Sequence, residues 1–195
     1  MSDQNASRNE ALVALAELVW PGRGFVLEAG RSGRLAVLFA MSLSAAVGHS
    51  YVGGEHLIAG GLRAGAVADD EVAEDLRRLA VAGVADSLRL AQVQPEQVHA
   101  WFADGRLDDP AEALRGLGPL PTVTPRAQSA MRRARVHAAG GAAGAVHVVA
   151  GVLEDPGVVA TVAYHHGLSL DAARAWVARR TAWGPLLDLV HEAES

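Results

Sequence analysis

Apolar residues recur at helical spacing in two neighbouring stretches joined by a glycine-rich loop. Between residues 34 and 47 they mark one face of a helix, and Gly48 stands where a C-terminal cap is expected. A second helix is predicted from Gly54 onward, with Leu57 and Ile58 turned toward a core. Residues 49–53 are therefore predicted to be a loop between two packed helices.

Start and stop signals elsewhere predict more helices. Thr124 and Pro125 form a strong helix start, because threonine caps the first turn and proline has no amide that needs a partner there. The helix that follows carries an alanine-rich stripe and ends at Gly140. A capping box at Ser7 starts an N-terminal helix that stops at Pro21. Further helices are predicted near residues 84–91, 95–103, 109–116, 158–165, 170–180 and 185–193.

The glycine loop and the helix after it return later in the chain as a degraded copy. His147 follows His56 by 91 residues (147 − 56), and the surrounding glycine and hydrophobic positions align at the same interval. Trp176 follows Trp101 by 75 residues (176 − 101), and both tryptophans are expected to anchor the core. The difference of 16 residues (91 − 75) indicates an acidic insertion between residues 62 and 84 of the first copy. A duplication of this kind determines the whole fold.

The duplication divides the chain into two repeats with extensions at both ends. The predicted bounds are 1–32 for an N-terminal helix and connector, 33–117 for the first repeat with its insertion near 63–82, 118–123 for a linker, 124–182 for the second repeat and 183–195 for a C-terminal helix. The two repeats are expected to form one compact domain. Within the insertion, Glu74 precedes Arg78 by four residues, the spacing of a helical ion pair, so a solvated helix face is expected there.

Composition narrows the classes of function. Half of the 195 residues are apolar, led by alanine, leucine, valine and glycine, which favours closely packed helices and an all-α fold. A net charge of −5 opposes nucleic-acid binding. All 17 cationic residues are arginines and there is no cysteine, so Schiff-base, P-loop and thiolate chemistry are excluded. With no apolar run long enough for a membrane span and no signal peptide, we expect a cytoplasmic protein without a cofactor.

Histidines are the remaining candidates for metal or acid–base chemistry. His165 and His166 are adjacent, and neighbouring side chains on a helix point about 100° apart, so they are poorly placed to share a metal. His56 and His147 occupy equivalent positions in the two copies, which favours a structural role in tying helix ends together. The chain has no nucleophile elbow and no HExxH motif, so no catalytic residue and no metal ligand is predicted.

Two motifs resemble a known family. The residues Gly48–Ile58, GHSYVGGEHLI, resemble the GHxxIGTEHLLLGLL signature of the Clp amino-terminal repeat domain, and Thr124–Ala127, TPRA, resembles the opening of its second repeat. The likeness covers roughly residues 33–180, apart from the acidic insertion. It implies two tandem, pseudo-twofold four-helix repeats, here with extra N- and C-terminal helices. In Clp unfoldases this domain precedes ATPase modules and receives adaptors, tagged substrates or antibiotic peptides. Because this chain has no P-loop, the resemblance implies a stand-alone recognition module.

The resemblance also implies a binding site. In relatives, the glutamate of each signature lies in a site that accepts phosphoarginine on damaged proteins. Glu55 matches this glutamate, and we expect it to bind a ligand together with Tyr51. The second copy has Val146 at the same position, and valine cannot accept hydrogen bonds from a guanidinium group, so the second site is expected to be lost. Gly54 and Ala145 stand where threonine is usual.

These observations predict a non-enzymatic module that binds a peptide or a protein. It would act as a resistance decoy that sequesters a cyclic peptide antibiotic aimed at the Clp unfoldase, or as an adaptor-like binder of substrates bound for proteolysis. The alternative is a regulatory or assembly protein that contacts the Clp unfoldase through the acidic insertion and the N-terminal helix. The arginine-rich, lysine-free composition is typical of a GC-rich bacterial genome.

Overall fold

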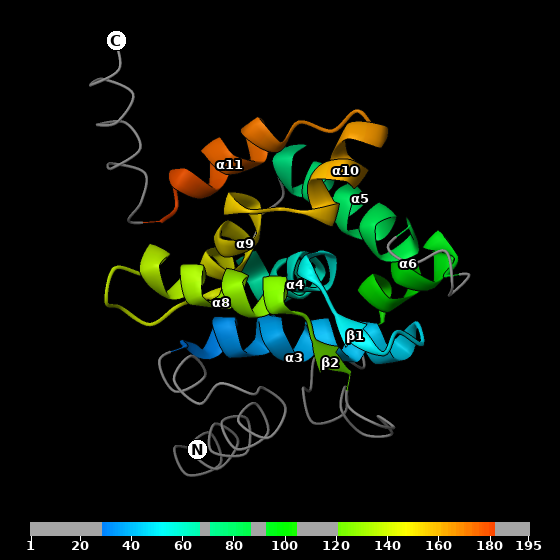
Figure 1. Ribbon diagram of the computed structural model, residues 1–195, viewed down its shortest axis with the longest axis horizontal. Coiled ribbons are helices and arrows are strands. Elements are labelled where there is room, and N and C mark those ends of the chain that lie inside the picture. Colours follow the sequence, from blue (N-terminus) through cyan, green and yellow to red (C-terminus); the bar gives the residue numbers. More distant parts are fainter. Residues whose placement is uncertain (1–28, 67–70, 87–92, 105–120, 182–195) are drawn as a thin grey trace.

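The computed structural model describes residues 29–66, 71–86, 93–104 and 121–181. Its elements, in chain order, are α3 (Arg31–Ala46), β1 (Tyr51–Val52), α4 (Gly54–Gly61), the π-helical turn η1 (Leu62–Ala66), α5 (Glu71–Asp86), α6 (Pro95–Ala103), β2 (Thr122–Val123), α8 (Pro125–His137), α9 (Ala145–Glu154), α10 (Val158–His165) and α11 (Leu170–Ala178). Helices dominate, so the predicted all-α class is confirmed (Figure 1).

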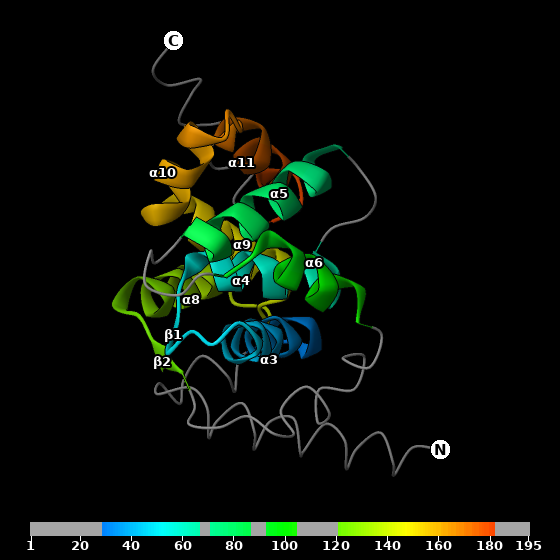
Figure 2. The same cartoon turned by 90° about the vertical axis from the view of Figure 1, so that its right-hand side faces the viewer.

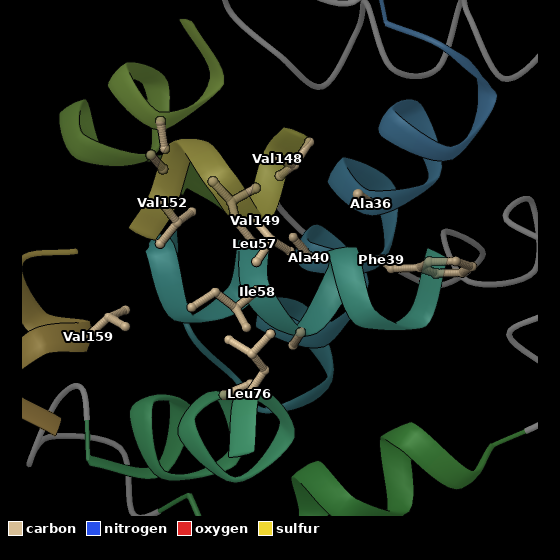
Figure 3. Packing of buried hydrophobic residues seen from close by; sticks show 14 of the residues in the cluster. Ala36, Phe39, Ala40, Leu57, Ile58, Leu76, Val148, Val149, Val152 and Val159 are labelled. Atoms are coloured by element: carbon tan, nitrogen blue, oxygen red, sulfur yellow. The ribbon is translucent and has the colours of Figure 1, made fainter. Parts of the chain in front are cut away.

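Helix α4 forms the centre of the molecule. Every residue from Glu55 to Gly61 is buried. In two perpendicular views α3 lies on one side of α4 and α9, whereas α5, α10 and α11 lie on the other (Figures 1 and 2). Figure 3 shows Leu57 and Ile58 among valines of α9 and the side chain of Leu76 from α5. The helix predicted from Gly54 onward therefore packs against the helices on both of its sides.

Two pairs of helices approach each other so closely that only glycine fits between them. A methyl group on Gly60 of α4 would lie 2.0 Å from the Ala36 carbonyl oxygen of α3. A methyl group on Gly151 of α9 would lie 2.1 Å from the Ala130 carbonyl oxygen of α8. The backbones of α3 and α4, and those of α8 and α9, are thus in direct contact, as small residues allow.

Short parallel pairings connect segments that are distant in the sequence. Tyr51 and Val52 of β1 pair with Thr122 and Val123 of β2. A single further bridge joins Ala29, just before α3, to residue 143, just before α9. Each pairing links the chain before one long helix to the chain after the other, so the two halves of the molecule are joined twice.

Two predicted helices have the expected bounds, and others differ at one or both ends. The helix at residues 95–103 is confirmed as α6, and that at 158–165 as α10. The helix predicted at residues 84–91 overlaps α5, which begins at Glu71, so the predicted start was wrong, and residues 87–91 lie outside the described part of the chain. Glu71, Glu74 and Asp75 of the predicted acidic insertion lie in the first turns of this helix. Buried side chains at positions 76, 79, 80 and 84 explain why the helix is longer than predicted.

The acidic face of α5 is solvated, as expected, but its ion pairs have a different spacing. Arg77 pairs with Glu74 and Arg78 with Asp75, both at i,i+3, whereas the sequence suggested Glu74 with Arg78. The helices predicted near 7–20, 109–116 and 185–193 lie outside the described residues. Within the described part of the chain, no single helix is long and apolar enough to cross a membrane, although α9 and α10 together pass on length and composition while bent by 82°.

Candidate functional site

A pocket of about 530 Å³ lies where three segments meet. These segments are the chain from β1 into α4, the first turns of α8, and the connection between α9 and α10, which gather beside the centre of the molecule (Figure 1). Tyr51 and Glu55, the two residues predicted to bind a ligand, both line it. The remaining lining residues are Gly53, Gly54, Thr124, Pro125, Arg126, Ala130, Val152, Asp155, Pro156 and Val158. The size and the mostly apolar wall suit a small molecule or a peptide side chain.

Glu55 is a buried carboxylate in the wall of this pocket, with only 4% of its surface exposed. Burial by itself raises the pKa of Glu55, but hydrogen bonds from His56, its own backbone and Tyr51, with the charge of His56, outweigh burial and hold the pKa below its usual value. The group is therefore ionised at neutral pH. A negative charge thus lies in the wall of the pocket.

Two glycines make room for this carboxylate. A methyl group on Gly53 would lie 2.3 Å from one Glu55 carboxylate oxygen and 2.5 Å from the other. On α5, a methyl group on Gly83 would lie 2.8 Å from the Glu55 Cβ. Glu55 is thus held between the start of its own helix and the last turn of α5. Its conformation depends on the absence of side chains at both positions.

His56 connects this carboxylate to a second imidazole. Its Nδ1 lies 3.2 Å from the Gly53 amide nitrogen and 3.1 Å from a Glu55 carboxylate oxygen. One ring nitrogen serves only one of them: it accepts from Gly53 or carries a hydrogen and donates to Glu55. Its Nε2 lies 2.9 Å from Nδ1 of His49. In both arrangements the hydrogen-bond chain ends on Nε2 of His49, which is buried and has no partner among the described residues.

The second copy keeps the histidine contact and loses the carboxylate. The Gly144 amide donates to Nδ1 of His147 over 2.9 Å, as Gly53 does to His56. Burial, followed by the charge of His137, lowers the pKa of His147, so its ring is neutral and can accept this bond. Ser32 supplies a polar side chain at this helix start instead of the missing carboxylate, because its Oγ accepts a hydrogen bond from the Ala145 amide over 3.2 Å. The start of α9 is therefore capped by a side chain of α3.

Arg126 supplies positive charge at the edge of the pocket. Its side chain is exposed, and its guanidinium lies against the backbone at Gly157, whose positive φ of 52° and lack of a side chain allow this approach. The neighbouring acid Asp155 pairs instead with Arg133, at 3.0 Å. Thr124 Oγ1 accepts from the Ala127 amide at the start of α8, which leaves its hydroxyl hydrogen as a donor. Glu55 and Arg126 thus give one pocket two charges of opposite sign.

The predicted tryptophan anchors lie away from this pocket. Trp101 is buried against Phe39, and its Nε1 donates to Ser42 Oγ over 3.4 Å. Trp176 is buried under the Arg180 guanidinium, which lies 4.0 Å from its ring. Neither residue lines the pocket.

Sequence reasoning missed Arg126, Asp155 and Val158 as lining residues. The TPRA motif marked the correct segment, but only as a helix start. Nothing local placed the start of α8 opposite the start of α4. The 91-residue interval indicated two related units, but not which of their surfaces would meet. No protein-family model matches the chain, and a search of curated proteins finds no match.

Proposed function

We propose that the chain is a stand-alone, non-enzymatic recognition module of the Clp amino-terminal type, which binds a peptide in the pocket between α4, α8 and α10. Its ligand is either a peptide that the Clp unfoldase also receives, including one that carries phosphoarginine, or a peptide antibiotic aimed at that unfoldase. In the second case the protein acts as a decoy that lowers the concentration of free drug.

A twofold repetition of contacts supports the family assignment. His147 and Gly151 follow His56 and Gly60 by 91 residues, and each pair makes the same contacts. The first helices repeat at 94 residues, since α8 begins at residue 125 and α3 at residue 31 (125 − 31). The three-residue difference equals the extra length of α3, which has 16 residues against 13 in α8. Three extra residues in α3 therefore account for the difference between the 94-residue and 91-residue intervals.

The strand pairings obey the same two intervals. Val52 pairs with Val123, and Ala29 pairs with Ala143. Ala29 precedes Val123 by 94 residues (123 − 29), and Val52 precedes Ala143 by 91 (143 − 52), so each pairing is the counterpart of the other. Reciprocal contacts of this kind are those of two related units around a twofold axis. They favour two tandem, pseudo-twofold repeats over an unrelated helical bundle.

The chemistry of the pocket carries the functional proposal. Its lining includes an ionised carboxylate, Glu55, an exposed guanidinium, Arg126, and two apolar side chains, Val152 and Val158. A ligand with a cationic and an anionic group on one side chain, such as phosphoarginine, complements both charges. A largely apolar cyclic peptide would use the valine wall instead.

The alternative, a partner of the acidic insertion, has less support. Glu74 and Asp75, the acidic residues of α5 nearest its start whose side chains the structure describes, already pair with Arg77 and Arg78 of the same helix. Exposed pairs of this kind contribute little to binding or stability. The proper test of this alternative is substitution of Glu74 and Asp75 by their amides. Deleting the acidic insertion would also remove Leu76, which is buried in the core, so a loss of binding would not identify the acidic side chains as its cause.

Calorimetric titration tests the proposal. A phosphoarginine peptide and a cyclic peptide that targets Clp unfoldases are titrated separately into the wild-type protein and into Arg126→Ala. Arg132→Ala is the matched control, because Arg132 is an exposed arginine of the same helix, is bonded to Ser129 and does not line the pocket. If the phosphoarginine peptide is the ligand, Arg126→Ala should weaken its binding about 10-fold or more, as expected for a lost charged hydrogen bond.

The control variant should bind like the wild type. A wild-type protein that binds neither peptide refutes both versions of the proposal. Binding of the cyclic peptide alone, unaffected by Arg126→Ala, would assign the decoy function and exclude a charged ligand group at the edge of the pocket.

A further inference from the structure

The Tyr51 side chain is the only aromatic ring among the pocket-lining residues, and three other side chains hold it. Its ring stacks on the His49 ring, with centroids 5.2 Å apart and planes 15° apart. Its ring also meets that of His56 nearly at a right angle, at 5.3 Å and 89°. Its hydroxyl donates a hydrogen bond to Glu55. The position of this wall of the pocket is therefore set by neighbours of Tyr51.

Of these three neighbours, only His49 lies outside the pocket lining and caps no helix, and within the part of the chain that the structure describes the one hydrogen bond of its ring is that between its Nδ1 and His56 Nε2. Glu55 lines the pocket itself, and Nδ1 of His56 lies 3.2 Å from the Gly53 amide nitrogen, as Nδ1 of His147 lies 2.9 Å from that of Gly144. His49 neither lines the pocket nor caps a helix, and its Nε2 has no partner among the described residues although the residue is 94% buried. A buried polar atom without a partner costs stability, so the ring needs another reason to be there.

The groups around His49 keep its ring uncharged and in place. Burial, and then the charge of His56, lower the pKa of His49 to about 4, although the charge of Glu55 acts in the opposite direction. The titratable neighbours are Tyr51 from β1 and Glu55 and His56 from α4. From α3, Ser44 donates to the carbonyl oxygens of His49 and Tyr51, over 3.2 and 2.6 Å. Backbone and ring are thus fixed together, and Tyr51 stacks on a neutral, immobile surface.

We infer that His49 is a positioning residue for ligand binding: it holds the Tyr51 ring at the wall of the pocket without touching the ligand itself. This inference rests on the proposed function for its consequence, because the pocket must bind a ligand for the orientation of Tyr51 to matter. Its structural half, that His49 sets the orientation of Tyr51, stands independently. The second copy has no aromatic residue at the corresponding place, residue 142, in keeping with a role confined to the first copy.

The two tyrosines of the chain allow a direct test. Incorporation of 3-fluorotyrosine gives two fluorine resonances, and Tyr164, which is 83% exposed, serves as the internal reference. Tyr164→Phe assigns the signals. In the folded wild-type protein the Tyr51 resonance should be displaced from that of Tyr164, and adding a bound peptide should move the Tyr51 resonance alone.

Three variants separate positioning from a purely structural role. His49→Ala removes the ring, and we expect the Tyr51 resonance to move toward the Tyr164 position while ligand affinity falls about 2- to 10-fold, the usual effect of one aromatic pair. His49→Phe keeps a flat ring but leaves His56 without its partner, so it should lower the denaturation midpoint yet preserve the Tyr51 resonance and the affinity. His99→Ala, an exposed histidine of α6, should change neither.

The outcomes distinguish this inference from the proposed function. An unchanged Tyr51 resonance in His49→Ala overturns it, provided that circular dichroism shows the variant folded. A moved resonance with unchanged affinity overturns the claim that orientation of Tyr51 matters for binding. If wild-type protein binds neither peptide, the proposed function and the consequence for binding fail together, whereas a moved resonance in His49→Ala would still support the structural half.

Discussion

The close approach of the helix backbones gives the sharpest prediction about the fold. Gly60→Ala would place a methyl group 2.0 Å from the Ala36 carbonyl oxygen and 2.7 Å from the Ala40 amide nitrogen. Ordinary contacts of this kind begin near 3.4 Å, so α3 and α4 would have to separate by about 1.4 Å. The obstacle is backbone, which cannot rotate away as a side chain can. Gly151→Ala meets the equivalent obstacle on α8, at 2.1 and 2.9 Å.

The expected loss follows from two opposing terms. Forcing extra volume into a packed core costs about 1–3 kcal/mol, and contact with backbone argues for at least the upper end of this range. Alanine improves on glycine in a helix by about 1 kcal/mol, which offsets part of that cost. The net loss should be roughly 2 kcal/mol for each variant, a large share of the 5–15 kcal/mol that stabilises a typical domain.

Urea denaturation followed by tryptophan fluorescence measures this loss. Both variants should lower the midpoint without changing the slope, which reports the surface exposed on unfolding. Gly30→Ala is the control, because a methyl group there would lie 3.5 Å or more from its neighbours. Its free energy of unfolding should stay within about 0.5 kcal/mol of the wild-type value. Wild-type midpoints for Gly60→Ala and Gly151→Ala would refute the backbone contacts. A loss in only one of them would argue against the twofold arrangement.

Three further results are expected. His49 should lower the free energy of unfolding by about 3 kcal/mol between pH 6.5 and 4. Its pKa is lowered to about 4 in the folded protein, so on acidification the unfolded chain binds a proton at this histidine at a higher pH than the folded protein does. Urea titrations at several pH values should show a smaller decrease in His49→Phe than in the wild type. Arg63→Lys should lower the free energy of unfolding by about 2 kcal/mol. The Arg63 guanidinium donates to carbonyl oxygens at the end of α6 and lies over the rings of Phe39 and Trp101. The control Arg132→Lys should leave the free energy of unfolding unchanged in the same urea titration. Calorimetry should give one bound ligand per chain, because the second copy lacks the glutamate and the Ser32 side chain caps the start of α9 there. A stoichiometry of two ligands per chain would contradict this prediction.

Local signals predicted those helices whose ends are marked in the sequence. Pro95 at the first position of α6 and Thr124 before α8 identified both starts, and the structure places the helices there. The start of α5 was missed because its first turns combine Glu74 and Asp75 with buried Leu76. The difference between the 91- and 75-residue intervals indicated an insertion, and the ion-pair spacing in it predicted a solvated helix face without marking where that helix begins. Helix starts marked by a capping residue or a proline were thus predicted correctly, whereas the start of α5, which only amphipathic periodicity marks, was not.

Pairing between distant segments could not be predicted from local signals. Strands β1 and β2 have two residues each and lie 71 positions apart (122 − 51), too short for a periodic pattern to mark them. Arg63 follows α4 with no sign that its guanidinium will reach Trp101 on α6. The internal repeat was the one long-range signal in the chain. It indicated that two units exist, but not which surfaces of them would meet.

The site shows why the identity of a residue is insufficient. Glu55 was singled out because Val146 replaces it in the second copy, yet the carboxylate alone does not make the pocket. Under the 94-residue interval the counterpart of Arg126 is Ser32 (126 − 94), which already caps the start of α9. Replacing Val146 by glutamate would therefore supply one charge without the other. Two residues from different helices distinguish the halves of the molecule, and only their juxtaposition in the fold makes one of them a binding site.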